Sequence, residues 1–265
     1  MEVSISQIKL FKACRRAYFL RYVENLHPVA KSNALQTGSD YHAFLENLYA
    51  GEISTCDYSK AYAMAKAYEK YIFPQLNSVK PEEKFSVEIA ENLTLIGRYD
   101  GIAEDGNLVE HKTTGEDNIE AYIFNLQWDE QILAYMLASG KRKIYYTVCK
   151  KPTIRLKKGE TEEEYYDRMV QWYDADTDNK IRLVEITRTD AEVEEFKQDL
   201  IRLLPHMIAC EDENECYKNT CNCTKWGTRC EYAGICLHYD RALQYCDFEK
   251  RNREEYYGNT ENDGF

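Results

Sequence analysis

The segment 85–112 is the part of the sequence that leaves the fewest choices of fold. Apolar and polar residues alternate along it, and an Asp-Gly pair at 105–106 provides the chemistry of a tight turn. We therefore expect a β-hairpin. Because successive side chains of a strand point to opposite faces, Glu110 and Lys112 share one face, and the turn can bring Asp100 back beside them.

These side chains form a candidate metal site. Two carboxylates, Asp100 and Glu110, can hold Mg²⁺ or Mn²⁺ while water and a substrate phosphate complete the coordination shell. Lys112 can orient or help deprotonate the attacking water, or stabilise charge on the phosphate. The backbone carbonyl of His111 is a further candidate ligand. The alternative is an exposed hairpin on which Glu110 and Lys112 form an ordinary ion pair.

Helices and strands alternate along most of the chain, which predicts the α/β class. Ser4 and Gln7 form the pattern of a capping box, so a helix is expected from there to about Asn25. Further strands are expected at 85–89, 93–100, 108–112, 144–149 and 181–187. Further helices are expected at 39–50, 58–72, 121–139, 162–173 and 190–204, with Pro205 stopping or kinking the last.

Charge and hydropathy exclude some classes of protein. The net charge of −12 argues against a surface that coats DNA nonspecifically, although a local basic channel is compatible with it. No run of eighteen apolar residues predicts a membrane span, and the N-terminus has no secretory pattern. We expect a cytoplasmic protein. Ten cysteines in such a chain indicate metal binding rather than a disulfide framework.

The sequence resembles a known family at two motifs. Gly97-Arg98-Tyr99-Asp100, followed by Leu108-Val109-Glu110-His111-Lys112-Thr113-Thr114, looks like the core of the PD-(D/E)XK nucleases. More narrowly, it resembles the RecB-like branch, which includes CRISPR-associated Cas-four exonucleases and phage exonucleases. The resemblance implies a mixed sheet flanked by helices, a bacterial or phage-infected host cell, and a Mg²⁺- or Mn²⁺-dependent DNA exonuclease.

Three more residues fit that family. Gln131 and Tyr135 match a Gln-x-x-x-Tyr motif, whose spacing places both on one helical face. The resemblance implies that they hold the substrate strand or orient the active site. His42 matches a histidine in an upstream helix, which implies a metal ligand or a water-positioning group. The alternatives are an ordinary amphipathic helix for Tyr135 and a purely structural histidine.

The cysteines fit the iron–sulfur members of the branch, which use one N-terminal and three C-terminal cysteines. The resemblance implies a [4Fe–4S] cluster held by Cys14, Cys223, Cys230 and Cys236. Cys221 is the alternative to Cys223, because the interval before Cys230 is longer than in many relatives. Zinc is the alternative to the cluster. The remaining cysteines are expected to be packing thiols: Cys56, Cys149, Cys210, Cys216 and Cys246.

A path for DNA can also be proposed from the sequence. Arg15, Arg16 and Arg21 lie near Cys14 and are candidates for phosphate contacts. Trp226 lies between the cluster cysteines and is a candidate for stacking on a base. The alternatives are a solvated helix face for the arginines and a lid over the cluster for Trp226.

The expected organisation has four parts: a helical region at 1–80, a nuclease core at 81–210, an iron–sulfur segment at 211–246 and a mobile acidic tail at 247–265. The expected function is hydrolysis of DNA in recombination, repair, phage replication or CRISPR adaptation. Its DNA is single-stranded or an end-containing duplex, and its candidate partners are a helicase, an annealing protein, a CRISPR adaptation protein or a second copy. The alternative is an iron–sulfur DNA-binding adaptor with little cleavage.

Overall fold

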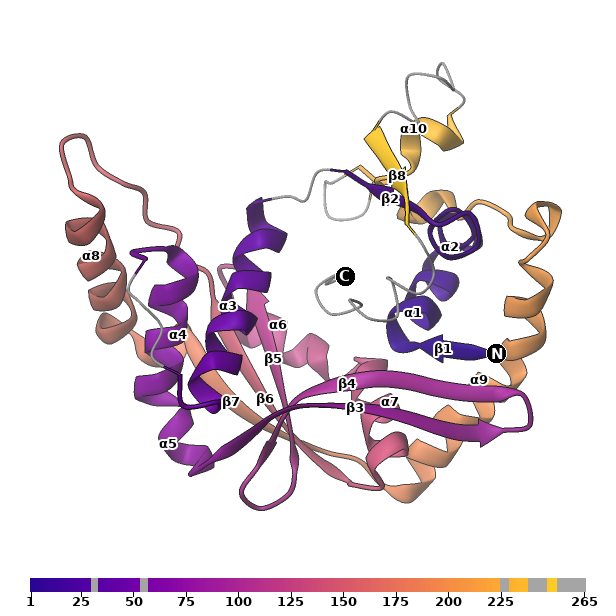
Figure 1. Cartoon of the computed structure of the whole chain (residues 1–265), viewed down its shortest axis with the longest axis horizontal. Helices are drawn as coiled ribbons and strands as arrows, with labels where there is room; N and C mark the ends of the chain where they lie inside the picture. The colour runs from indigo at the N-terminus through magenta and orange to yellow at the C-terminus, as the bar shows by residue number, and fades with distance from the viewer. Residues whose placement is uncertain (30–32, 53–56, 225–228, 238–246, 252–265) are drawn as a thin grey trace. The chain divides into compact units, whose positions relative to one another are not determined.

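The computed structural model describes the chain except for residues 30–32, 53–56, 225–228, 238–246 and 252–265 (Figure 1). The chain forms two compact units, and each is assembled from segments that are separated in sequence. Unit 1 comprises residues 1–32, 86–96 and 195–265, and unit 2 comprises residues 33–85 and 97–194.

Unit 2 is built on a mixed sheet. Its strands are β3 (Val79–Ala90) and β4 (Leu93–Ala103), which both continue into unit 1, and β5 (Leu108–Thr114), β6 (Lys143–Lys150) and β7 (Ile181–Thr187). β4 pairs with β3 and, antiparallel, with β5 across the predicted turn. β5 and β6 are parallel because helices connect them, and β7 is antiparallel to β6. The predicted mixed α/β fold is confirmed.

Helices cover both faces of this sheet, as Figure 1 shows. They are α3 (Asn33–Tyr49), α4 (Lys60–Tyr71), α5 (Phe73–Leu76), α6 (Ile119–Leu126), α7 (Glu130–Ser139), α8 (Glu162–Ala175) and a short 3-10 helix (Thr177–Asn179). One apolar core joins α3, α4 and α8 to strand residues such as Val109 and Cys149. A second core joins α6 and α7 to residues such as Leu108 and Ile144.

β5 therefore lies between two apolar cores. Leu108 belongs to one core and Val109 to the other, as the period of two requires. Glu110 continues on the face of α7 and His111 on the face of α3 and α4. The consecutive residues Glu110 and His111 thus place polar groups in two buried environments, one next to α7 and the other next to α3 and α4.

Two predicted helices differ from the structure. The predicted helix at 121–139 is interrupted, because the Asp129 side chain accepts the Gln131 N–H at 2.9 Å and so caps a new helix, α7. The helix predicted to end near Leu204 is α9 (Asp190–Ala209), and Pro205 lies inside it. α9 begins in unit 2 and continues into unit 1.

Unit 1 begins with β1 (Glu2–Ser4), which pairs in parallel with residues 94–96 of β4. The capping box of Ser4 and Gln7 is present, but the predicted long helix is broken because Cys14 is extended (φ −162°, ψ 111°). The elements that follow are α1 (Ile5–Ala13), α2 (Arg15–Tyr18), a π-helical turn (Phe19–Val23), β2 (Leu26–Pro28), 3-10 turns (Glu213–Glu215 and Thr220–Asn222), α10 (Ala233–Cys236) and β8 (Phe248–Lys250), which pairs with β2.

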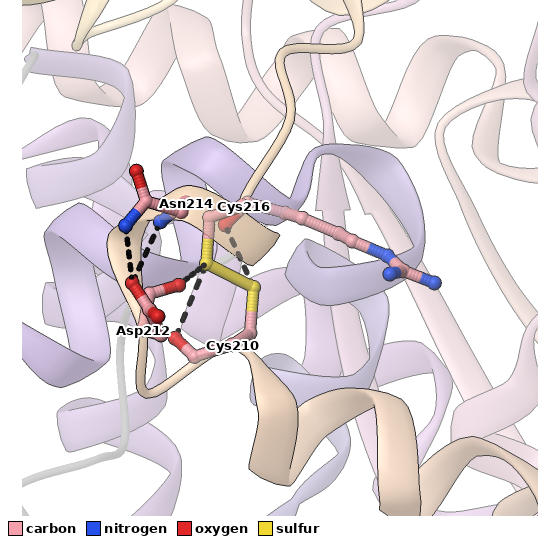
Figure 2. The surroundings of a disulfide bond; sticks show 5 residues. Cys210, Asp212, Asn214 and Cys216 are labelled. Carbon is pink, nitrogen blue, oxygen red and sulfur yellow. Dashed lines mark hydrogen bonds between the residues drawn. A yellow bond between two sulfur atoms is a disulfide. The ribbon is translucent and has the colours of Figure 1, made fainter.

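A disulfide joins Cys210 and Cys216, which we expected to be separate packing thiols (Figure 2). The chain turns back after α9 because the Asp212 carboxylate accepts the Asn214 N–H and its side-chain amide, both at 2.9 Å. This turn brings the two cysteines together, with Cα atoms 5.4 Å apart. Within the described parts of the chain, no helix is long and apolar enough to cross a membrane.

Candidate active site

The hairpin brings Asp100 next to β5 at the point where the backbone pairing of β4 with β5 ends. β4 and β5 pair at Gly101↔Val109 and Ile102↔Leu108. Beyond these pairs, the His111 N–H is bound by the Asp100 side chain, with 2.7 Å between N and Oδ2. Gly101 allows β3 to pack closely against β4, because a Cβ there would lie 2.5 Å from Val79 Cγ1. The Asp100 carboxylate is thus fixed by the strand that carries the other site residues.

Glu110, Lys112, Gln131 and Tyr135 form one hydrogen-bonded group between β5 and α7. Lys112 Nζ donates to Glu110 Oε1 at 2.8 Å and to Gln131 Oε1 at 2.7 Å. Gln131 Nε2 lies 2.8 Å from Glu110 Oε1 and 2.7 Å from the Tyr135 hydroxyl oxygen. The structure thus brings together the two motifs singled out in the sequence, which lie nineteen or more residues apart.

His42 of α3 faces Asp100 from the other side, with His42 Nδ1 3.5 Å from Asp100 Oδ1. Burial alone would raise the pKa of Asp100, but His42 and the His111 N–H lower it well below its usual range. Burial works against a proton on His42, yet the Asp100 charge raises the pKa of His42 above its usual value. Asp100 and His42 thus stabilise each other's charged forms.

Glu110 is in a less favourable position. Its side chain is buried, and Oε2 has no hydrogen-bond partner among the described residues. Burial, and then repulsion by Asp100, raises the pKa of Glu110 to about 7 despite the neighbouring Lys112. An additional positive charge beside Asp100 and Glu110 would relieve both effects.

A hard divalent cation fits this requirement. Asp100 and Glu110 offer oxygen ligands, and the unpartnered Oε2 is a free ligand atom. No group of three or more His, Cys, Asp or Glu side chains in the described parts of the chain is arranged to hold a metal ion. The fit therefore rests on two carboxylates, with other ligands to come from backbone carbonyls, water or substrate. His42 and His111 as metal ligands stay predictions.

Lys112 is held as an ammonium. Burial alone would lower its pKa, but Glu110 and then Asp129 raise it above its usual range. Lys112 Nζ also lies 5.9 Å from the centre of the Tyr146 ring. Asp129 was not among the residues that we singled out, and its position directly before the Gln-x-x-x-Tyr helix was the available signal.

His111 is anchored on the opposite face of β5. Its Nε2 lies 2.7 Å from the Tyr49 hydroxyl and its Nδ1 lies 2.5 Å from Thr147 Oγ1. The Tyr49 hydroxyl also lies 2.6 Å from that of Tyr68. Burial lowers the pKa of His111 to about 3, so the ring is neutral. Tyr49 was missed, although it follows His42 by two helical turns.

The four sequence-predicted cysteines all lie in unit 1, but among the described residues no three of them are arranged to hold a metal ion. Cys14 Sγ accepts the Asn219 N–H at 3.4 Å, and the Cys230 N–H donates to the Cys223 carbonyl at 2.8 Å. Burial raises the pKa of Cys230 to about 11, and the Cys236 and Cys14 thiols add to that rise.

Cys236 completes this group. Burial raises its pKa first, and among the charges near it are those of Cys14 and Cys223. Cys14 thus lies close enough to raise the pKa of both Cys230 and Cys236, and Cys223 close enough to raise the pKa of Cys236. Cys221 is exposed and takes no part in these interactions.

The predicted DNA-contacting arginines all have partners inside unit 1. Arg15 lies over the Phe11 and Tyr217 rings, with its guanidinium carbon 5.0 and 4.8 Å from their centres. Arg16 pairs with Glu213 at 2.5 Å, and the buried Arg21 pairs with Glu231 at 3.0 Å. Trp226 lies outside the described residues. Contact of these four residues with DNA stays a prediction.

Comparisons with known proteins bear on this site. The family model of the PD-(D/E)XK nuclease superfamily matches residues 2–79 and 59–237. No curated protein matches the sequence.

Among solved structures, a protein from Eubacterium rectale described as a candidate exonuclease has a TM-score of 0.54 and 14% identity, over 89% of this chain and 86% of that one. It shares the fold. An alkaline exonuclease from Laribacter hongkongensis has a TM-score of 0.38 and 15% identity, over 81% of this chain and 91% of that one. A phage-related exonuclease from Haemophilus somnus has a TM-score of 0.35 and 13% identity, over 70% of this chain and 87% of that one.

The raised pKa of Glu110 makes stability depend on pH. The folded chain keeps a proton on Glu110 that the unfolded chain releases near 4.5, so in EDTA this group's contribution to stability is lost as the pH rises from 4.5 to about 7. We expect the free energy of unfolding of Glu110→Gln, measured relative to that of the wild type, to be about 1–3 kcal/mol higher at pH 8 than at pH 5. Urea unfolding at both pH values measures this gain. An unchanged difference would mean that Glu110 ionises freely.

The bonds on the other face of β5 predict a cost for Tyr49→Phe. It removes the hydroxyl that partners both His111 and Tyr68, and we expect the free energy of unfolding to fall by about 1–3 kcal/mol. Tyr71→Phe is the matched control, because its hydroxyl bonds to Asp174 at the surface. Equal losses for the two variants in urea unfolding would contradict the importance of this network.

Proposed function

This chain belongs to the PD-(D/E)XK nuclease superfamily, and from that premise we propose that it is a metal-dependent DNA nuclease with its active site at Asp100, Glu110 and Lys112. The observation that carries the proposal is the buried Glu110 carboxylate. One of its oxygens has no partner among the described residues, and its charge is opposed by Asp100. Such a pair is suited to bind Mg²⁺ or Mn²⁺.

The reaction is hydrolysis of a phosphodiester. Water attacks phosphorus, a P–O bond breaks, and the leaving oxygen gains a proton. When bound, the divalent cation supplies a Lewis acid and lowers the pKa of water. Asp100 and Glu110 would hold this cation, and His42 and the His111 N–H keep Asp100 charged and oriented.

Lys112 acts as a cation. Its ammonium is held by Glu110 and Gln131, and the raised pKa keeps it protonated, so we assign it to stabilise negative charge on the attacked phosphate rather than to accept a proton. Gln131 and Tyr135 are positioning residues. The Gln131 amide bonds to Lys112, Glu110 and Tyr135 together, and so holds the lysine over the carboxylates.

Cleavage from DNA ends is the finer part of the proposal. It is supported by the fold shared with the Eubacterium rectale protein, which is described as a candidate exonuclease. It is also supported by the match of the Gln-x-x-x-Tyr motif to the RecB-like branch.

We further propose an iron–sulfur cluster held by Cys14, Cys223, Cys230 and Cys236. The support is that Cys14 lies within electrostatic reach of Cys230 and Cys236, that Cys223 lies within reach of Cys236, and that four thiolates suit a [4Fe–4S] centre. In this role the cysteines would join the break between α1 and α2 to the C-terminal part of unit 1. Asn219 and Asn222 already bind there, because both amides donate to the Ala13 carbonyl, at 2.8 and 2.6 Å.

Cleavage of end-labelled linear and circular DNA with Mn²⁺ tests the nuclease proposal. We expect linear DNA to be degraded, and Asp100→Asn to lower the rate at least about 100-fold because a fixed metal ligand is lost. Asp199→Asn, which loses only a surface pair with Arg202, should cleave normally. Binding without cleavage by the wild type would favour a DNA-binding adaptor instead.

Absorbance of anaerobically purified protein tests the cluster. We expect a brown protein whose broad visible absorbance is lost in Cys230→Ser and kept in Cys221→Ser, because Cys221 is exposed and apart from the other thiols. Colourless protein with stoichiometric zinc would identify a zinc site. Loss of colour in Cys221→Ser together with retention of colour in Cys223→Ser would show that Cys221 is the ligand in place of Cys223.

A further inference from the structure

Unit 2 contains a basic loop that the active site does not use. Residues 150–158, which connect β6 to α8, include Lys150, Lys151, Arg155, Lys157 and Lys158 and no acidic residue. In a chain of net charge −12 this is an unusual concentration of positive charge. We call these nine residues the basic loop.

Three side chains, one from α4 and two from α8, donate hydrogen bonds to the backbone of the basic loop. Lys60 Nζ of α4 donates to the Pro152 carbonyl at 3.1 Å. The Tyr165 hydroxyl and Arg168 Nη2 of α8 donate to the carbonyls of Ile154 and Arg155, both at 2.7 Å. These hydrogen bonds fix the path of the loop backbone along α8.

Three cationic side chains of the basic loop are exposed, whereas Lys150 is buried and Lys151 is partly buried. Arg155, Lys157 and Lys158 are exposed, and no ion pair joins them to another described residue. The nearest acids in sequence are largely occupied. Glu160 is held by Arg168 through two bonds of 2.7 and 2.8 Å.

The acids that follow belong to the start of α8. Glu164 completes a capping box with Thr161. Glu162 and Glu163 lie in the first turn, where negative charge stabilises the helix. These acids have local structural roles. Within the basic loop, Lys150 is likewise occupied, because its Nζ donates to the Asp117 carbonyl at 2.9 Å, whereas Arg155, Lys157 and Lys158 form no ion pair with a described residue.

The basic loop begins at the active-site end of the sheet. β6 runs parallel to β5 with Lys112 opposite Val148 and Thr114 opposite Lys150. The Lys151 N–H donates to the Thr114 carbonyl at 2.7 Å, two residues beyond Lys112. From Lys150 to Lys157, an extended chain reaches at most about 25 Å. That is the rise of about 7 base pairs of duplex DNA.

We propose that the basic loop binds the phosphate backbone of duplex DNA at a distance of up to about 7 base pairs from the bond being cut. This inference rests on the proposed nuclease function and adds where the enzyme holds its substrate. The exposed Arg155, Lys157 and Lys158 make the contacts. The fixed loop backbone keeps them in register with the active site, so that the duplex is oriented before cleavage.

The test compares two triple variants. The first replaces Arg155, Lys157 and Lys158 with Gln. The matched control replaces Lys80, Lys84 and Lys141 with Gln, which are exposed cations on β3 and before the opposite end of β6. Fluorescence anisotropy in EDTA measures binding to a 30-base-pair duplex and to a hairpin DNA with a stem of 6 base pairs, over a range of salt.

We expect the loop variant to bind the long duplex about tenfold more weakly near 100 mM salt, and the slope of log affinity against log salt to fall by about 2–3. Binding to the short hairpin and its Mn²⁺-dependent cleavage should match wild type, as should the control variant throughout.

Wild-type behaviour of the loop variant on the long duplex would overturn the inference, as would an equal loss in the control variant or on the short hairpin. In each of these cases wild-type cleavage would leave the nuclease proposal standing. A wild-type protein that neither binds nor cuts DNA would overturn both.

Discussion

The burial of Glu110 beside a permanently charged Asp100 is the constraint on which the site depends. Burial and repulsion raise the pKa of Glu110, and the groups around the pair partly stabilise its charged form. Lys112 supplies one positive charge, Gln131 holds that charge in place, and one oxygen of Glu110 is left without a partner among the described residues. A cation beside the two carboxylates would offset both the burial and the repulsion, which is why the proposed function assigns a divalent metal to them.

β5 makes this arrangement possible because it carries polar side chains to both faces of a buried sheet. Glu110 and Lys112 meet α7 on one face, while His111 is anchored by Tyr49 and Thr147 on the other. The His111 N–H then holds Asp100 in the plane of the strand. The bonds from Tyr49 and Thr147 to the His111 ring therefore help to set the position of the Asp100 carboxylate, although they lie on the opposite face of β5 from Glu110.

Unit 1 has a different kind of polar core. Its arginines are engaged by aromatic rings and by Glu213 and Glu231, and Cys236 lies near Cys14, which stands at the break after α1, and near Cys223. The disulfide between Cys210 and Cys216 shows that sequence spacing did not separate bonded from unbonded cysteines. Two cysteines six residues apart can be bonded only if the chain turns back, and the Asp212 turn decides that.

The sequence by itself determined the hairpin, the α/β class and the shared face of Glu110 and Lys112, because turn chemistry and the period of two are local properties. It also placed Gln131 and Tyr135 on one helical face, since their spacing is one turn. Only the tertiary structure decided that Asp129 stands near Lys112, and that Tyr49 and Thr147 hold His111. These contacts join residues far apart in the chain, and no local pattern encodes which buried groups meet across a sheet.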